Sequence, residues 1–438
     1  MKTFKAALLG CALLAAVSTA GAQQNEQFIP ILSYRVGPYA AGGSGYFGGM
    51  IDYFNLVNLN GGINGVKLSW EECETEYNAS RGVECYERLK KKNGGATSVE
   101  PLSTGIAYGL LDRVAQDKVP MTTFGYGSAN AADGRVFEWV FPVGTSYWSQ
   151  AAAMIAYLGQ KEGGLDKLKG KKIVDLYHDS AFGKEPLPVF DAMASRFGFE
   201  LTKLAVAHPG NTQESQWLQI RQIKPDYVIL WGWGVMNPTA LKAAAKVGFS
   251  RDKMLGVWWA GSEEDVIPAG DAAKGYVTAA FSAPGTSFPV MQDIQKKLYA
   301  AGKGNLEDKS RQGSIYHTRG VTYGIVLVEA MRKAQERFGK GKVMSGEQVR
   351  WGLENLNLTE ARIKELGAGG MFPPIKTSCA DHEGSAQVKF QVWDGKSFKP
   401  VTGFMKGDTD MIRKMVEESS AKYAAEKKLT PRDCSKVT

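Results

Sequence analysis

Residues that could contact a small molecule gather in six short stretches of this 438-residue chain, each combining glycine with hydroxyl or aromatic side chains. Three stretches carry serine, threonine and tyrosine, and they cover residues 39–45, 102–105 and 124–128. The other three carry phenylalanine and tryptophan, the last with one acidic residue, and they cover residues 181–183, 231–234 and 258–263. Hydroxyl and free backbone N–H groups suit a carboxylate. Aromatic rings together with an acid suit an apolar body and an ammonium group.

Sequence patterns typical of catalysis are missing. The chain has no GxSxG, HExxH or GxxxxGK[ST] motif, and its four histidines and five cysteines are not spaced as zinc ligands. Acidic residues 263–265 form a cluster, but acids in a loop are more often solvated than catalytic. We therefore expect a binding protein that is not an enzyme and that holds no metal and no cofactor.

The six stretches fall between strand-like and helix-like segments, which alternate along the chain. A strand pattern over 29–34, a glycine-rich turn over 37–45 and a helical pattern from Phe47 open the series. The alternation continues to residue 123 and then restarts from 146 to 259, which is typical of parallel sheets. Ligands of such sheets bind beyond the carboxyl ends of the strands, where the six stretches lie. The sequence thus predicts an α/β protein with two doubly wound, parallel-sheet lobes.

The remainder of the chain is expected to complete these lobes. Helical patterns over 289–300, 314–338 and 345–356 would cover the first sheet. A strand hairpin over 387–401 turns at Asp394-Gly395, a pair that favours tight hairpins, and a charged helix follows over 409–428.

The N-terminal 22 residues are predicted to be a signal peptide. Lys2 and Lys5 precede the apolar run 6–17, and residues 20–22 form a small-residue cleavage site before Gln23. A lipoprotein cleavage box ending at Cys11 is the alternative. No later run is long enough to cross a bilayer, so the mature chain is expected to be soluble and exported.

Charge gives no indication of a nucleic-acid partner. Loss of Lys2 and Lys5 lowers the formal charge from +8 to +6. The basic run 88–92 has acids close by, so it is interpreted as a solvated helix end.

Four cysteines remain after Cys11, and an even count in an exported protein suggests disulfides. Cys73 ends a predicted strand and Cys85 lies in the next helix, a span that one bridge could close. Cys379–Cys434 would then hold the C-terminal tail. Four free thiols are the alternative.

Several motifs, taken together, resemble those of a known family. They are Gly37-Pro38-Tyr39-Ala40 with Gly61-Gly62-Ile63-Asn64-Gly65 and Lys67, Asp179-Ser180-Ala181-Phe182-Gly183, Pro225-Asp226-Tyr227-Val228 with Gly232, and Asp381-His382-Glu383-Gly384 before Val392-Trp393-Asp394-Gly395-Lys396. The chain resembles the periplasmic substrate-binding proteins of branched-chain amino-acid-type ABC transporters, of which the Leu/Ile/Val-binding proteins are members. The resemblance runs through most of the mature chain.

The resemblance implies a type I periplasmic binding protein, a Venus-flytrap of two lobes joined by a three-segment hinge. The N-terminal lobe would comprise residues 23–144 plus 282–384, and the C-terminal lobe and tail residues 145–281 plus 385–438. It implies a monomer that closes on a small solute and then docks on an inner-membrane ABC permease, without making or breaking a bond.

The resemblance also implies a set of ligand-binding residues. Hydroxyls and backbone groups for a carboxylate would come from Ser103, Thr104, Tyr126, Gly127 and Ser128, and the ammonium of an amino acid would meet Glu263, with Glu264 as an equal alternative for that place. The remaining contacts would come from Tyr39, Ser44, Phe182, Trp233 and Gly234.

Departures from the family pattern put leucine, isoleucine and valine in doubt as ligands. Tyr126 is bulkier than the small residue usual there, and tryptophans 231, 233, 258 and 259 make the second-lobe loops unusually aromatic. A planar or aromatic carboxylate, or an amide, is therefore an alternative to an amino acid.

Two other functions are alternatives. One is a ligand-sensing binding protein that serves a receptor or regulator. The other is an exported oxidoreductase, because Gly43–Gly48 matches the dinucleotide motif GxGxxG. That motif should follow its strand at once, whereas residues 35–42 intervene, which argues against the oxidoreductase.

Overall fold

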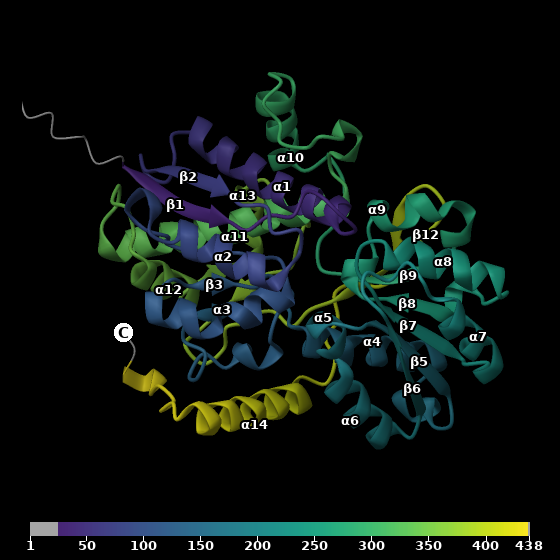
Figure 1. The fold of residues 1–438 in the computed structure, drawn as a ribbon. Helices are drawn as coiled ribbons and strands as arrows, with labels where there is room; N and C mark the ends of the chain where they lie inside the picture. The colour runs from purple at the N-terminus through teal and green to yellow at the C-terminus, as the bar shows by residue number, and fades with distance from the viewer. Residues whose placement is uncertain (1–24, 437–438) are drawn as a thin grey trace, which may run out of the picture.

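The computed structural model describes residues 25–436, so the predicted signal peptide and Cys11 lie outside the described residues. The chain folds into two α/β lobes that lie side by side (Figure 1). The first lobe contains two short parallel pairs, β1 (Glu26–Ile31) with β2 (Lys67–Glu72) and β3 (Met121–Thr122) with β4 (Val140–Phe141). Single bridges from Ile31 to Glu100 and from Val99 to Met121 join the two pairs.

Helices surround these strands. They are α1 (Ala40–Leu59), α2 (Ala79–Leu89), α3 (Thr104–Asp117), α10 (Pro289–Ile294), α11 (Ile315–Phe338), α12 (Gly346–Glu354) and α13 (Glu360–Glu365). A small antiparallel pair, β10 (Asn357–Leu358) with β11 (Ile375–Lys376), completes the first lobe.

The second lobe is built on one seven-stranded sheet with the order β13-β12-β9-β8-β7-β5-β6. Its strands are β5 (Lys172–His178), β6 (Glu200–Val206), β7 (Tyr227–Trp231), β8 (Met254–Gly256), β9 (Val277–Ala280), β12 (Lys389–Trp393) and β13 (Phe398–Pro400). Strands β5 to β9 pair in parallel, whereas the predicted hairpin β12–β13 adds an antiparallel edge. The helices are α4 (Tyr147–Glu162), α5 (Ala181–Lys184), α6 (Leu187–Phe197), α7 (Glu214–Ile223), α8 (Met236–Lys246) and α9 (Glu263–Val266). The predicted fold class, two parallel-sheet α/β lobes, is confirmed.

The chain changes lobes between β4 and β5, after β9 and between β11 and β12. Gly144 and Gly384 form a bridge, so two of these crossings run side by side. The Gly144 N–H donates to the Glu383 carbonyl at 2.7 Å, and the Glu383 carboxylate accepts the Ser146 N–H at 2.6 Å.

The glycine-rich segment after β1 differs from the prediction, because it is helical rather than a turn. Helix α1 begins at Ala40, and its glycines allow a close approach to α11. A Cβ added at Gly49 would lie 2.1 Å from the carbonyl oxygen of His317, and one at Gly320 would lie 1.9 Å from that of Tyr46. Packing of the two backbones therefore outweighs the roughly 1 kcal/mol that each glycine costs a helix. The GxGxxG match lies within α1 and cannot form a dinucleotide-binding turn.

The C-terminal helix α14 (Thr409–Lys427) connects the lobes on one side of the molecule (Figure 1). Asp408 at its start pairs with Arg196 of the second lobe, and Lys427 at its end pairs with Asp112 of the first lobe at 2.7 Å. Beyond α14, Cys434 forms a disulfide with Cys379, and Cys73 forms one with Cys85. Both predicted pairings are confirmed.

Candidate functional site

A small cavity, tightly filled by its lining side chains, lies between the two lobes. Six of its eight lining residues are aromatic, and the full set is Tyr77, Leu102, Thr104, Tyr126, Tyr147, Phe182, Trp233 and Trp259. Several of them lie in the segments that follow strands, for example Trp233 after β7 and Trp259 after β8. The cavity therefore lies where the carboxyl ends of two parallel sheets face each other.

Two polar groups that line the cavity lack a protein partner. Within residues 25–436, neither the Thr104 hydroxyl nor the Trp233 indole N–H has a hydrogen-bond partner, and both atoms are buried. The two residues are 1% and 3% exposed. Thr104 is the first residue of α3, in the first lobe, whereas Trp233 belongs to the second lobe. An unpaired buried donor costs about 1–3 kcal/mol, so a ligand that accepts from both would recover this cost.

The first-lobe wall of the cavity is fixed by buried hydrogen bonds around residue 102. The Tyr126 hydroxyl accepts the Leu102 N–H at 2.7 Å, and the Tyr34 hydroxyl donates to the Leu102 carbonyl at 2.9 Å. Glu100 lies behind this wall, and the Tyr46 hydroxyl donates to it at 3.3 Å. Burial raises the pKa of Glu100 to about 8, which keeps the carboxyl protonated at neutral pH.

Direct contacts between the lobes close the cavity on one side. The Tyr39 hydroxyl, from the first lobe, is hydrogen-bonded to His178 Nε2 at 2.8 Å and to His208 Nδ1. Its ring stacks on Trp233 with centroids 6.5 Å apart, and a Cβ added at Gly234 would lie 2.5 Å from the same ring. The glycine thus lets the Trp233 loop approach Tyr39.

A second contact between the lobes is made by Glu185. Glu185, at the end of α5, accepts the Ala129 N–H at 3.2 Å and the Tyr108 hydroxyl. Burial raises the pKa of Glu185 to about 8. With these two contacts between the lobes, the structure represents a closed conformation.

The acids after β8 contact α11 rather than the cavity. Glu263 accepts the Ile315 N–H at 2.8 Å, and Glu264 accepts the Ser314 hydroxyl at 2.7 Å. Burial, followed by the charge of Glu264, raises the pKa of Glu263 to about 7. Neither residue is among those that line the cavity.

A buried cation lies behind the cavity wall. The guanidinium of Arg319, from α11, packs over the ring of Trp259 at 5.0 Å and donates through Nη1 to the Trp258 carbonyl. Its Nε and Nη2 have no partner in the described part of the chain. Burial lowers the pKa of Arg319 to about 10, so the group stays charged at neutral pH.

The residues proposed from the sequence fall into three groups. Thr104, Tyr126, Phe182 and Trp233 line the cavity, and Tyr39 and Gly234 lie at its rim. The other five do not line the cavity. Ser103, Ser128 and Glu263 form hydrogen bonds with protein groups, namely the Ile106 N–H, the Asn130 side chain and the Ile315 N–H. Gly127 packs against Thr123, and Ser44 lies within α1.

Four lining residues were not among those proposed. Leu102 and Trp259 belong to stretches singled out in the sequence, but smaller or more polar neighbours were chosen instead. Tyr77 follows β2 and Tyr147 begins α4, and no local motif marks either residue. The position of Tyr147 directly after the Gly144 crossing is the one signal that could have indicated it.

Comparison with known proteins agrees with this geometry. A family model described as periplasmic binding protein matches residues 26–397, and the chain therefore belongs to the periplasmic binding protein family. This family includes the substrate-binding proteins of ABC transporters, which deliver small molecules to a membrane permease.

Solved structures with the same fold include one described as an ABC transporter permease from the Pseudomonas fluorescens group. It is 44% identical with a TM-score of 0.87, and the match covers 94% of this chain and 100% of that chain. A branched-chain amino acid ABC transporter from Thermus thermophilus with bound valine is 20% identical with a TM-score of 0.74, and the coverages are 90% and 99%. A solute-binding protein from R. palustris in complex with benzoate is 18% identical with a TM-score of 0.68, and the coverages are 87% and 97%. A search of curated proteins found no match.

The described residues were compared with the requirements of a membrane-spanning helix and of a metal site. No helix among them is both long enough and apolar enough to cross a membrane. They also contain no cluster of three or more histidine, cysteine, aspartate or glutamate residues suited to a metal ion.

Proposed function

We propose that this protein captures a small carboxylate-bearing solute between its lobes and delivers it to an inner-membrane ABC permease. The observation that carries the proposal is the aromatic cavity between the lobes with one unpaired donor from each lobe, Thr104 and Trp233. An amino acid, an aromatic acid and a related amide all remain within this class.

Three features support a carboxylate. Thr104 opens the 14-residue helix α3, whose first turn presents backbone N–H groups and the positive end of the helix dipole. The Arg319 guanidinium places a positive charge behind Trp259. Valine and benzoate, bound in two remote relatives of the same fold, both contain a carboxylate.

Closure is the proposed mechanism of capture. The ligand binds to one lobe, and the second lobe adds the Trp233 and Phe182 contacts together with the bonds from Tyr39 to His178 and from Tyr108 to Glu185. A ligand favours the closed form only by binding it more tightly than the open form, so the interlobe contacts determine selectivity. The closed form would then dock on the permease.

A ligand screen tests the proposal. Amino acids, aromatic acids and amides are added to the purified protein, and tryptophan fluorescence and the melting temperature are recorded. Trp233 and Trp259 line the cavity, so a true ligand should change the emission. A ligand at 100 times its Kd should stabilise the protein by about 2.7 kcal/mol. No response to any of these compounds contradicts the proposal.

The proposed location and state are also testable. We propose that export removes residues 1–22 and that the mature protein is a monomer. N-terminal sequencing of periplasmic protein and size-exclusion chromatography with light scattering check the two points.

A further inference from the structure

We infer that the cleft is selective for a flat aromatic carboxylate without an α-ammonium group, held between Thr104 of one lobe and Trp233 of the other. This inference rests on the proposed function, because it specifies the ligand of the same cavity.

The lining of the cavity favours a flat aromatic body. Among its lining residues, all of which belong to the described chain, none carries a formal charge and six are aromatic. Trp233 and Trp259 meet edge to face, with an interplanar angle of 81° and centroids 5.5 Å apart, and Tyr126 meets Trp259 at 72°. Both ring faces and ring edges therefore border the same small space. A ligand ring can stack on the face of one side chain and contact the edge of another.

The size of the cavity limits the ligand to a small molecule. Its free space of about 10 Å³ is one water-sized volume, far below the roughly 300–1,000 Å³ of pockets that hold drug-sized ligands, so a ligand enters only as the ring side chains move apart. Tyr126 and Tyr147 both occupy volume in the cavity lining, and the Leu102 N–H bond holds Tyr126 in place. A single ring with a short substituent suits this space better than a branched aliphatic chain, which would not use the ring faces.

An α-ammonium group would meet no carboxylate among the residues that line this cavity. The nearby acids Glu263 and Glu264 already accept from Ile315 and Ser314 at the start of α11, and neither lines the cavity. The charge of Arg319 behind Trp259 also repels a second cation. A buried charge without a partner costs several kcal/mol, so the cavity disfavours amino acids.

The two unpaired donors determine how the ligand lies. Thr104 at the N-terminus of α3 suits the carboxylate, and the Trp233 N–H suits a second acceptor, such as a ring hydroxyl or heteroatom. Since the donors belong to different lobes, one ligand that satisfies both also holds the lobes together.

Calorimetric titration of the full mature protein tests the inference. The probes are benzoate and 4-hydroxybenzoate on one side and L-phenylalanine, L-leucine and L-valine on the other. We expect the aromatic acids to bind at least about 100-fold more tightly than the amino acids, because of the missing ammonium partner. Preferential binding of the amino acids would overturn the inference and leave the proposed function intact. Absence of binding by all five probes, together with no response in the wider screen, would overturn both.

Two variants test the donors. Trp233→Phe keeps a ring but removes the N–H, and Thr104→Val keeps the shape but removes the hydroxyl. Each should weaken 4-hydroxybenzoate by about tenfold or more, as expected for one lost hydrogen bond to a buried partner. Only Thr104→Val should weaken benzoate to a similar degree, because benzoate lacks the second acceptor.

Trp351→Phe is the matched control. The Trp351 N–H on α12 is also buried and unpaired in residues 25–436, but it lies outside the cavity. Circular dichroism and the melting temperature show whether each variant is folded. Equal affinity of folded Trp233→Phe and Trp351→Phe for 4-hydroxybenzoate would contradict the assigned role of Trp233.

Discussion

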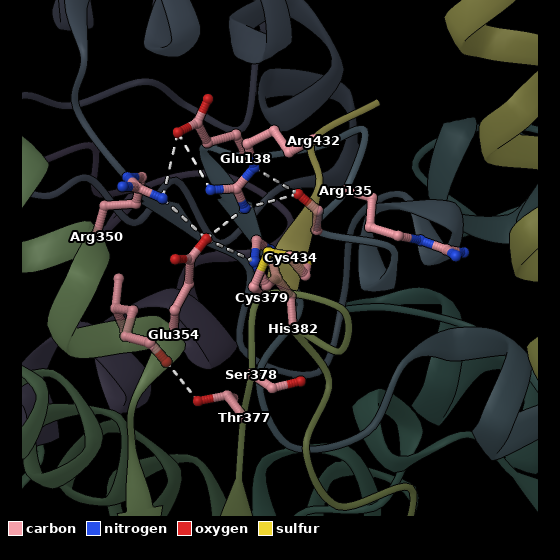
Figure 2. Close-up of polar contacts among 12 residues, drawn as sticks. Arg135, Glu138, Arg350, Glu354, Thr377, Ser378, Cys379, His382, Arg432 and Cys434 are labelled. Atoms are coloured by element: carbon pink, nitrogen blue, oxygen red, sulfur yellow. Dashed lines mark hydrogen bonds and ion pairs between the residues drawn. A yellow bond between two sulfur atoms is a disulfide. The ribbon is translucent and has the colours of Figure 1, made fainter. Parts of the chain in front are cut away.

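Glu354 under the C-terminal tail and Glu263 beside the cleft are both buried, yet their pKa values are shifted in opposite directions. Figure 2 shows Glu354 among the basic side chains of Arg350, Arg432 and His382, with Glu138 nearby. Burial opposes ionisation of Glu354, but the hydrogen bonds and charges of His382, Arg432 and Arg350 outweigh it and lower its pKa to about 2. Burial dominates at Glu263 and raises its pKa to about 7.

The difference distinguishes a structural contact from a binding site. We call the structural contact, in which Arg432 and Cys434 of the tail meet Glu354 and Cys379, the joint. Under the tail, carboxylate and guanidinium groups compensate one another, and Cys379–Cys434 fixes the same region covalently (Figure 2). Around the cleft, buried acids lack a basic partner at bonding distance, aromatic rings dominate and two donors stay unpaired in the described chain. The first arrangement holds segments together at neutral pH, whereas the second leaves interactions for a ligand to complete.

The largest expected effect comes from Glu354→Gln. The substitution leaves Arg432 and Arg350 partly uncompensated in a buried site, and we expect a loss of about 3–5 kcal/mol in the free energy of unfolding. Urea denaturation at pH 7 measures it.

The same variant has a pH signature. The lowered pKa means that Glu354 contributes stability above about pH 4.3, its unfolded value, and that this contribution is lost as pH falls through about 2. Glu354→Gln should remove this part of the acid transition. Glu138→Gln, with a 34% exposed side chain, is the control and should cost about 1 kcal/mol or less.

Removal of a disulfide should have the next largest effect. Cys379–Cys434 closes 55 residues and Cys73–Cys85 closes 12, so chain entropy assigns them about 4 and about 3 kcal/mol. The double variant Cys379→Ser/Cys434→Ser should therefore lower the melting temperature more than Cys73→Ser/Cys85→Ser. The reverse order would show that the joint under the tail depends on its charges rather than on its covalent bond.

Acid should weaken ligand binding through Tyr39. Burial, followed by the charge of His208, lowers the pKa of His178 to about 4, although the charge of Asp179 acts in the opposite direction. Burial also lowers the pKa of His208. When the lobes separate, we expect the pKa values of His178 and His208 to return toward about 6.5. Closure of the lobes then requires both imidazoles to be neutral. The affinity for the ligand is therefore highest above about pH 6.5 and is lost as the pH falls toward 4.

Titration with a bound probe between pH 8 and 4.5 checks this dependence. We expect a fall of about tenfold in affinity between pH 7 and 5. Tyr39→Phe should bind about 3- to 10-fold more weakly at pH 7 and show a shallower pH profile, because the hydroxyl that contacts both rings is gone. An unchanged profile in this variant would assign the pH effect to other groups.

The smallest effect is expected for Glu263→Gln. The amide oxygen can still accept the Ile315 N–H, and the cavity loses no lining group, so affinity for an aromatic acid should change by about twofold or less. Because the raised pKa of Glu263 costs stability as pH rises toward and through 7, the variant should also lose less stability between pH 5 and 8. A large loss of affinity would show that Glu263 contacts the ligand.

Much of the fold could be predicted from local patterns. Strand and helix periodicity indicated β5 to β8 and α11 closely, and the Asp394-Gly395 turn indicated the β12–β13 hairpin. The N-terminal part of α1 was missed because its glycines are poor helix formers. These glycines allow α1 to pack closely against α11, which lies more than 260 residues further along the chain. Local helix propensity carries no information about such a distant contact.

The cavity was predictable only in part for a similar reason. Loops after strands indicated Thr104, Tyr126, Phe182 and Trp233, because the carboxyl ends of parallel strands meet at one edge. Whether Glu263 faces the ligand or a helix end depends on where the start of α11 lies. Tyr77 and Tyr147 depend likewise on how the lobes close, which sequence spacing does not specify.

The Cys379–Cys434 bond has a consequence for how the chain can be cut. Residues 379 and 434 both belong to the first-lobe side of the joint, whereas β12 and β13 between them lie in the second lobe. The peptide chain thus leaves the first lobe and returns to it within a covalent ring. A protease that cleaves once between β13 and α14 would break the path from the second lobe to α14, but the helix would remain attached to the first lobe. Its release would require a reductant.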